Sequence, residues 1–290
     1  MRHLPRSAFR ASLLILALAA TGAMPAMAAD TPAAASEPAA DSALQAVLAG
    51  DWRSADNRAR DPYRHPAETL AFFGLKAGQT VVEITPGGGW YAEILAPYLR
   101  GNGQYVAAIV DPAAVAEGRG RDYQQRSRDG LEKRFADAPA QFDAAKIVAY
   151  DPAAPEFGQP GSADLVLTFR NVHNWRGSGQ AEGMFKGFFE VLRPGGVLGV
   201  VEHRAKADVP ADDRSGYVGE AQVIAMAEAA GFVLDGRSEV NANPKDTKDH
   251  PNGVWTLPPG NNHDAADADK YRAIGESDRM TLRFVKPRGE

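Results

Sequence analysis

Three consecutive glycines follow an acidic residue and a short run of β-branched residues. Residues 81–91 read VVEITPGGGWY, and residues 92–96 (AEILA) continue in a helical pattern. A buried strand that ends in a glycine turn and opens a helix presents free backbone N–H groups to a ligand. Glycine also permits positive φ and lets a ligand approach the backbone closely. The pattern predicts a turn that binds a nucleotide or nucleoside, with Glu83 as the nearest acid.

Two kinds of ligand fit this turn. Gly87, Gly89 and Ala92 match the dinucleotide fingerprint G-x-G-x-x-A, in which a helix N-terminus binds pyrophosphate. Glu83 argues against pyrophosphate, because a carboxylate at the end of the strand repels phosphates and attracts a cationic ligand. A P-loop is excluded because Trp90 occupies the place of its lysine. A fold that has lost its ligand is the remaining alternative.

Two histidines follow predicted strands: His173 comes after residues 164–169, and His203 comes after residues 197–202. Ligands bind at the carboxyl ends of strands in an open α/β sheet, so both histidines are candidate bases for a hydroxyl or amine acceptor. Each has an alternative role as a buried histidine whose ring bonds to Asn171 or to a backbone carbonyl. No metal-ligand spacing is recognised and the chain has no cysteine, so no metal site is predicted.

Strands and helices alternate along most of the chain. The predicted strands are 80–84, 105–110, 146–150, 164–169, 197–202, 232–240 and 280–285. The predicted helices are 66–73, 93–99, 118–134, 184–192 and 221–230. This alternation predicts an α/β, Rossmann-like, doubly wound sheet that is mostly parallel. No crossover helix is predicted between the last two strands, so we expect the C-terminal strand to be antiparallel.

Taken together, these motifs resemble those of the class I S-adenosylmethionine-dependent methyltransferases. The first motif of that family is an acid and a hydrophobic residue followed by G-x-G-x-G. Here residues 83–89 read EITPGGG, with Thr85 in place of the first glycine. Residues 163–175 (ADLVLTFRNVHNW) resemble the family's fourth-strand motif, and residues 192–196 (LRPGG) resemble the hairpin before its fifth strand.

A narrower resemblance is to a group of exported bacterial predicted methyltransferases. It rests on YRHP at 63–66, RNVHNW at 170–175 and NPKDTKDHP at 243–251. The wider resemblance implies S-adenosyl-L-methionine as the cofactor and methyl transfer to a small-molecule acceptor, with His173 and His203 as candidate bases. The alternative is an exported, non-enzymatic module that binds a small ligand on the same fold.

The resemblance also implies a set of residues that contact the methyl donor. Asp111 follows the second strand and matches the family's ribose-binding acid, and Asp151 follows the third strand, near the expected adenine. A carboxylate can accept hydrogen bonds from both ribose hydroxyls. The implied donor-contacting residues are Glu83, Thr85, Gly87, Gly88, Gly89, Asp111, Asp151 and Asn171.

The first 28 residues match a signal peptide. Three arginines precede an apolar core at 13–18, and residues 26–28 (AMA) fit a cleavage site. We expect a flexible leader at 29–42, a methyltransferase-like domain at 43–290, and a periplasmic or secreted protein without a membrane span after cleavage. The formal net charge of −5 argues against a nucleic-acid partner, which requires a basic face.

A long polar segment, residues 241–276, separates the last two predicted strands. Unstructured loops of this length are uncommon within a domain and are often functional. We expect a lid-like insertion over the pocket that is anchored by Trp255 and Leu257, with His250 or Asp249 facing the substrate. The alternative is a surface loop that Trp255 holds against the core.

Several arginines precede the first predicted helix. They are Arg53, Arg58, Arg60 and Arg64, and they alternate with Asp56 and Asp61. Such a run is more often a solvated face of paired charges than a binding surface. We therefore expect paired surface residues here, and an anion-binding rim near the pocket is the alternative.

Overall fold

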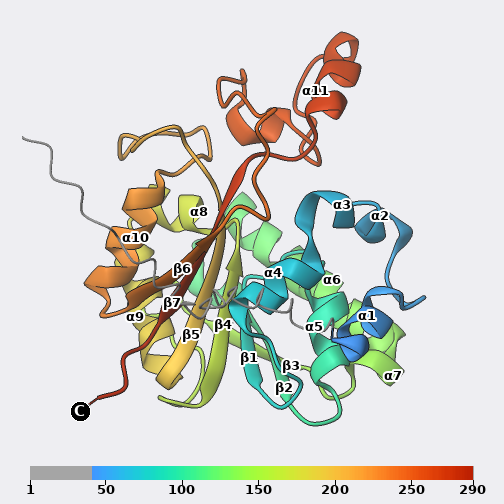
Figure 1. Cartoon of the computed structure of the whole chain (residues 1–290), viewed down its shortest axis with the longest axis vertical. Coiled ribbons are helices and arrows are strands. Elements are labelled where there is room, and N and C mark those ends of the chain that lie inside the picture. The colour runs from blue at the N-terminus through green and yellow to red at the C-terminus, as the bar shows by residue number, and fades with distance from the viewer. Residues whose placement is uncertain (1–40, 290) are drawn as a thin grey trace, which may run out of the picture. The chain divides into compact units, whose positions relative to one another are not determined.

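The computed structural model describes residues 41–289, which form a seven-stranded sheet with helices on both faces (Figure 1). The strand order is β3-β2-β1-β4-β5-β7-β6. The strands are β1 (Thr80–Ile84), β2 (Gln104–Val110), β3 (Lys146–Tyr150), β4 (Ala163–Phe169), β5 (Leu192–His203), β6 (Val233–Ser238) and β7 (Arg279–Val285). The strands β1 to β5 pair in parallel, and β7 runs antiparallel to both of its neighbours. The predicted fold class, including the antiparallel C-terminal strand, is confirmed.

The central strands are buried on both faces, which explains their continuous apolar runs. Side chains alternate across β1: Val82 and Ile84 join the core on one face, whereas Val81 joins the core on the other. Glu83 shares the face of Val81, and it lies in register with Ala107 of β2. A charged residue is therefore inserted into an apolar strand one position before the strand ends.

Two layers of helices cover the sheet. One core cluster includes residues of α1 (Ser42–Leu48), α4 (Pro66–Phe73), α5 (Ala92–Leu99), α6 (Arg119–Asp137) and α7 (Pro139–Phe142). The other includes residues of α8 (Val172–Gly177), α9 (Ala181–Val191) and α10 (Glu220–Ala229). The apolar stripe of α9 is core as predicted, since Met184, Phe185 and Phe188 are fully buried. Two short helices, α2 (Ala55–Arg58) and α3 (Asp61–Arg64), precede α4.

The segment between β6 and β7 projects beyond one edge of the sheet and is drawn in orange to red in Figure 1. It contains the 3₁₀ turns η2 (Gly253–Thr256) and η3 (Ala265–Asp267) and the helix α11 (Ala268–Ile274). The sequence pattern did not predict α11. Because β6 and β5 are both antiparallel to β7, they run in the same direction. The insertion therefore starts at the edge where the parallel strands end.

The predicted signal peptide, 1–28, and nearly all of the predicted leader, 29–42, lie outside the described residues. The described part begins with Asp41, which caps α1 by accepting hydrogen bonds from the backbone N–H groups of Ala43 and Leu44. Among residues 41–289, no helix has both the length and the apolar character needed to span a membrane.

Candidate functional site

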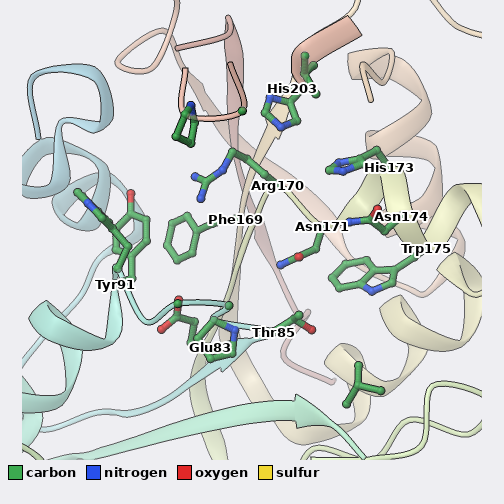
Figure 2. A pocket seen from close by; sticks show the side chains of 18 of the residues that line it. Glu83, Thr85, Tyr91, Phe169, Arg170, Asn171, His173, Asn174, Trp175 and His203 are labelled. Atoms are coloured by element: carbon green, nitrogen blue, oxygen red, sulfur yellow. The ribbon is translucent and has the colours of Figure 1, made fainter. Parts of the chain in front are cut away.

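A cavity of about 920 Å³ lies at the carboxyl ends of β1 to β5. Each strand contributes a residue at or just after its end; these are Thr85, Val110, Tyr150, Arg170 and His203. A cavity of this volume accommodates a nucleoside-sized ligand together with a second small molecule. In Figure 2, Glu83 and Thr85 lie at one end of the view, the rings of His173 and His203 lie at the other, and Arg170 lies between them.

The glycine turn opens onto this cavity. A Cβ atom at Gly87 or Gly88 would meet no atom within 4 Å, and both residues line the cavity. Gly89 has a different role, because its Cβ would lie 3.2 Å from Leu131 of α6. Gly87 and Gly88 thus leave space for a ligand, whereas Gly89 allows α6 to approach the turn.

Thr85 occupies the position of the missing first glycine and adopts a left-handed conformation with φ of +51°. A β-branched residue rarely adopts this conformation, and the strain is of the order of 1–3 kcal/mol. The Thr85 hydroxyl lies 2.8 Å from the hydroxyl of Tyr150, which also lines the cavity. The hydrogen bond between the end of β1 and the end of β3 offsets part of the strain.

Glu83 lines the cavity from the end of β1, and only 2% of its surface is exposed. The Tyr105 hydroxyl donates to its Oε2 atom at 2.6 Å. Burial raises the pKa of Glu83 to about 7, although the Tyr105 hydrogen bond and the charge of Arg170 oppose this shift. A cationic group beside Glu83 would stabilise the ionised form.

Asp111 and Asp151 are adjacent to the cavity wall but do not form part of it. The N–H of Ala113 donates to Oδ1 of Asp111 at 2.9 Å, and the N–H of Ala153 donates to Oδ1 of Asp151 at 2.8 Å. Each carboxylate therefore caps the turn that follows its strand. The structure does not bring these two predicted residues into the same wall as Glu83.

Asn171 is buried at the start of α8, and it lines the cavity. Its side-chain amide donates to the carbonyl of Ile84 at 3.0 Å and lies 3.3 Å from the Thr168 hydroxyl. The amide therefore joins the ends of β1 and β4 and fixes the position of the segment that carries His173.

His173 and His203 come together, with ring centroids 5.3 Å apart. The fully buried side chain of Glu202 lies next to them, and its Oε1 atom is 3.0 Å from Nδ1 of His173. Glu202 was not predicted as a site residue from the sequence. The Nδ1 atom of His203 is 2.5 Å from the Ser277 hydroxyl. A single acid at the end of the apolar run VLGVVEH was the signal that could have identified Glu202.

His173, Glu202 and His203 are also a candidate metal site, because their ligand atoms lie within 4.8 Å of one another. The sequence analysis did not predict this convergence. However, Glu202 already accepts hydrogen bonds from the backbone N–H groups of both histidines, at 3.3 and 2.8 Å. Burial and the positive charge of Arg170 lower the pKa of His203 well below its usual value. Both carboxylate oxygens of Glu202 already accept from backbone N–H groups, so a hydrogen-bonded base fits the arrangement better.

The prediction of a solvated arginine face was wrong for three of the four residues, since Arg53 and Arg64 are buried and Arg60 is partly buried. Arg53 pairs with Asp61 through two hydrogen bonds of 2.7 and 2.8 Å, as expected, although it is itself buried. Arg60 and Arg64 instead line the cavity and share Glu276, whose oxygen atoms lie 2.7 Å and 3.1 Å from their Nε atoms. Arg60 and Arg64 therefore lie beside the pocket, as the alternative expected, and the acid that they pair with is Glu276.

The insertion supplies one side of the cavity through Val254, Trp255, Pro258, Pro259, Gly260, Glu276 and Ser277. Leu257 is fully buried, as expected of an anchor, but Trp255 is 43% exposed and its ring centroid lies 6.0 Å from that of His173. Neither Asp249 nor His250 lines the cavity, which contradicts the expectation that one of them faces it. His250 lies 2.9 Å from Asp246, a buried carboxylate that holds the insertion together.

Several solved structures share the fold that carries this site. A methyltransferase from Aquifex aeolicus, described as S-adenosylmethionine-dependent, is similar over 84% of this chain and 98% of its own, with a TM-score of 0.52 and 15% identity. The [4+2]-cyclase SpnF is similar over 86% of this chain and 93% of its own, with a TM-score of 0.55 and 16% identity. The fold is the Rossmann-like methyltransferase fold.

A putative sarcosine dimethylglycine methyltransferase from Galdieria sulphuraria is also similar, with a TM-score of 0.51 and 14% identity, over 79% of this chain and 86% of its own. No family model matches the sequence, and no curated protein matches it. Identities this low show the fold alone. A cyclase is among the similar structures, so the fold alone does not determine which reaction is catalysed.

Proposed function

We propose that the protein transfers a methyl group from S-adenosyl-L-methionine to a small-molecule acceptor. The observation that carries this proposal is Glu83, a buried carboxylate beside an open glycine turn in a cavity of about 920 Å³. The methyl donor carries an ammonium and a sulfonium, which favour the ionised form of Glu83. A pyrophosphate would be repelled by the same carboxylate, which argues against a dinucleotide.

The residues at the turn fit such a donor. Glu83 accepts hydrogen bonds, Gly87 and Gly88 leave room for a close approach to the backbone, and Asn171 holds the neighbouring strand ends together. Thr85 lines the cavity, whereas Gly89, Asp111 and Asp151 lie just outside its wall; we propose that Asp111 reaches the ribose from there and that Gly89 and Asp151 support the donor site. When bound, the donor supplies a methyl group that its sulfonium already activates.

The protein then has two tasks: to align the acceptor with the methyl group and to remove one proton. Alignment alone provides much of the rate enhancement in a reaction of this kind. His173 lines the cavity, and Glu202 fixes its ring through a 3.0 Å hydrogen bond. We propose that His173 acts as the base, that Glu202 positions it, and that the neutral ring of His203 lines the acceptor side. This histidine–carboxylate pair favours catalysis over a purely binding role.

We also propose that the chain is exported, since residues 1–28 match a signal peptide. A fusion to a reporter that is active only outside the cytoplasm tests this: an active reporter supports export, and an inactive one refutes it. The same result decides whether the protein meets its methyl donor inside or outside the cytoplasm.

Calorimetry with S-adenosylmethionine, S-adenosylhomocysteine and NAD tests the proposed function. We expect both sulfur ligands to bind with a dissociation constant of about 100 μM or tighter, and NAD to give no heat. Asp111→Ala should weaken both by about tenfold, through loss of the ribose contact. Asp143→Ala, at an exposed pair with Arg100, is the control. Absence of binding by both sulfur ligands would refute the proposal, and unchanged affinity in Asp111→Ala would remove the ribose assignment.

A further inference from the structure

Four guanidinium groups converge at one end of the cavity around a single carboxylate. Glu276 lies within 2.7 Å of Arg60, 3.1 Å of Arg64 and 3.0 Å of Arg279. The fourth, Arg170, is near enough that its charge contributes to lowering the pKa of Glu276 to about 2. One carboxylate thus balances only one of these positive charges.

Several donor atoms in this cluster have no partner. The Nη2 atom of Arg60 and the Nη1 atom of Arg64 are buried without a hydrogen bond among the described residues. Arg64 as a whole is only 2% exposed. Buried polar groups in native proteins are almost always hydrogen-bonded, so an unsatisfied guanidinium nitrogen in a cavity wall is open to a ligand or a water molecule in the cavity.

Arg170 is a second, independent indication. Its side chain makes no hydrogen bond or ion pair with any residue between 41 and 289, and in Figure 2 its guanidinium extends over Phe169 toward the middle of the cavity. Its backbone is left-handed, with φ of +61°. Such strain in a residue other than glycine is concentrated at binding and active sites.

The charges of the cavity wall contrast with those of the whole chain. The chain has a formal net charge of −5, yet the cavity is lined by three arginines and only two acids, Glu83 and Glu276. Glu276 is already shared among arginines, and Glu83 belongs to the donor end. Planar guanidinium groups bind carboxylates and phosphates through paired hydrogen bonds.

We infer that Arg60, Arg64 and Arg170 form a binding site for an anionic group, a carboxylate or a phosphate, carried by the methyl acceptor. This inference rests on the proposed methyl transfer. Arg170 lies between the Glu83 end and the histidine pair in Figure 2, so an acceptor anchored there presents its nucleophile between the donor and His173. The methyl donor also carries a carboxylate. The experiment must therefore distinguish an anion on the acceptor from the carboxylate of the donor.

Titration with inorganic phosphate and with citrate, followed by the fluorescence of the tryptophans, tests the inference. Trp90 reports directly, since the Arg64 guanidinium lies 4.7 Å from its ring. We expect saturable binding of at least one anion to the wild type and at least tenfold weaker binding to Arg170→Met and Arg60→Met. Arg100→Met, at an exposed pair with Asp143, is the matched control and should bind like the wild type. Circular dichroism of each variant verifies folding, and Arg170→Met removes no hydrogen bond or ion pair within the described residues.

The same titration in saturating S-adenosylhomocysteine separates the two sources of the anion. Retained anion binding, together with an unchanged affinity of Arg170→Met for S-adenosylhomocysteine, supports an acceptor site. Loss of anion binding, with a tenfold weaker affinity of Arg170→Met for S-adenosylhomocysteine, assigns the arginines to the donor and overturns the inference. Binding of S-adenosylhomocysteine with no binding of either anion refutes the inference alone. If an anion binds but S-adenosylhomocysteine does not, the proposed function is refuted, and the acceptor assignment falls with it.

Discussion

The Nδ1 atom of His173 lies 3.0 Å from Oε1 of Glu202, a side chain with no exposed surface. Glu202 also accepts hydrogen bonds from two backbone N–H groups, those of His173 and His203. An ionised carboxylate only accepts hydrogen bonds, so if Glu202 is ionised, a neutral His173 ring donates from Nδ1 and keeps a lone pair on Nε2. This is the form that a general base requires.

Nitrogen NMR of the histidine rings tests this arrangement. We expect a single tautomer at His173, with the proton on Nδ1, at pH values where the ring is neutral. Glu202→Gln replaces a carboxylate that only accepts hydrogen bonds with an amide that can both donate and accept, and a mixture of tautomers should result. Glu190→Gln, on the exposed part of α9, is the control and should leave the spectrum unchanged. A single Nε2-protonated form in the wild type would contradict the assignment of His173 as the base.

The glycine turn offers a matched pair of substitutions. Gly87 has φ of +58° and Gly88 does not have a positive φ, yet a Cβ at either position meets no atom within 4 Å. Gly87→Ala should therefore lose about 1–2 kcal/mol of stability, the cost of a left-handed residue with a side chain. Gly88→Ala should unfold like the wild type. We expect both to weaken S-adenosylhomocysteine binding, as measured by calorimetry, because both methyl groups enter the ligand space. Equal stabilities in urea unfolding would show that backbone strain at Gly87 is unimportant.

The pKa of Glu83 near 7 makes ligand binding dependent on pH. In the folded protein the pKa of Glu83 lies above its ordinary value of 4.5, so protonation of Glu83 stabilises the fold at low pH. This stabilisation is lost as the pH rises from 4.5 toward 7. A ligand with an ammonium group favours ionised Glu83, so binding should release a proton between pH 5 and 7 and tighten as the pH rises through that range. Calorimetry in buffers of different ionisation enthalpy measures this release.

Two comparisons isolate Glu83 in that experiment. Glu83→Gln cannot ionise and should bind S-adenosylhomocysteine with little pH dependence over the same range. The neutral nucleoside 5′-methylthioadenosine lacks the amino acid part of the donor, and its affinity should not vary with Glu83 ionisation. A pH dependence that persists in Glu83→Gln would assign the proton release to another group.

Glu276 should contribute strongly to stability. Its pKa is lowered to about 2 because Arg64 and Arg279 outweigh its burial. The stabilisation is therefore fully present above its ordinary pKa of 4.5 and is lost as the pH falls toward 2. Glu276→Gln should cost about 3–5 kcal/mol at pH 7, since it leaves buried guanidinium groups unpaired. Asp143→Asn, at an exposed pair, should cost less than about 1 kcal/mol in the same urea unfolding experiment. Equal costs would mean that solvent screens the Glu276 cluster.

Hydrogen exchange tests whether the insertion closes over the ligand. Five of the residues 253–260 line the cavity, and Trp255 is 43% exposed. If the insertion is a lid, S-adenosylhomocysteine or an acceptor anion should slow amide exchange in this segment by about tenfold or more. The helix α10, none of whose residues line the cavity, should exchange at the same rate with and without ligand. Unchanged exchange at 253–260 would make the insertion a fixed wall.

Local sequence patterns were sufficient for the framework of this protein. Apolar runs fixed the parallel strands, the glycine turn after Glu83 marked the ligand edge, and His173 and His203 were identified because each follows a strand. These features depend on residues close together in the chain, where the backbone geometry of strands and turns determines the outcome. Residues 192–196, by contrast, were expected to form a hairpin before the strand. They are instead part of β5, which is longer than predicted.

Only the tertiary structure decided which charged residues share the cavity. Arg64 and Glu276 are 212 positions apart, and His173 and Glu202 are 29 positions apart, so no local pattern relates either pair. These contacts matter for stability because the residues are buried, and a buried charge is costly unless it has a partner. The same reason explains the misjudged arginines. A sequence shows that Arg60 and Arg64 are charged, but only the tertiary packing shows that Arg64 is buried and that both line the cavity beside Glu276.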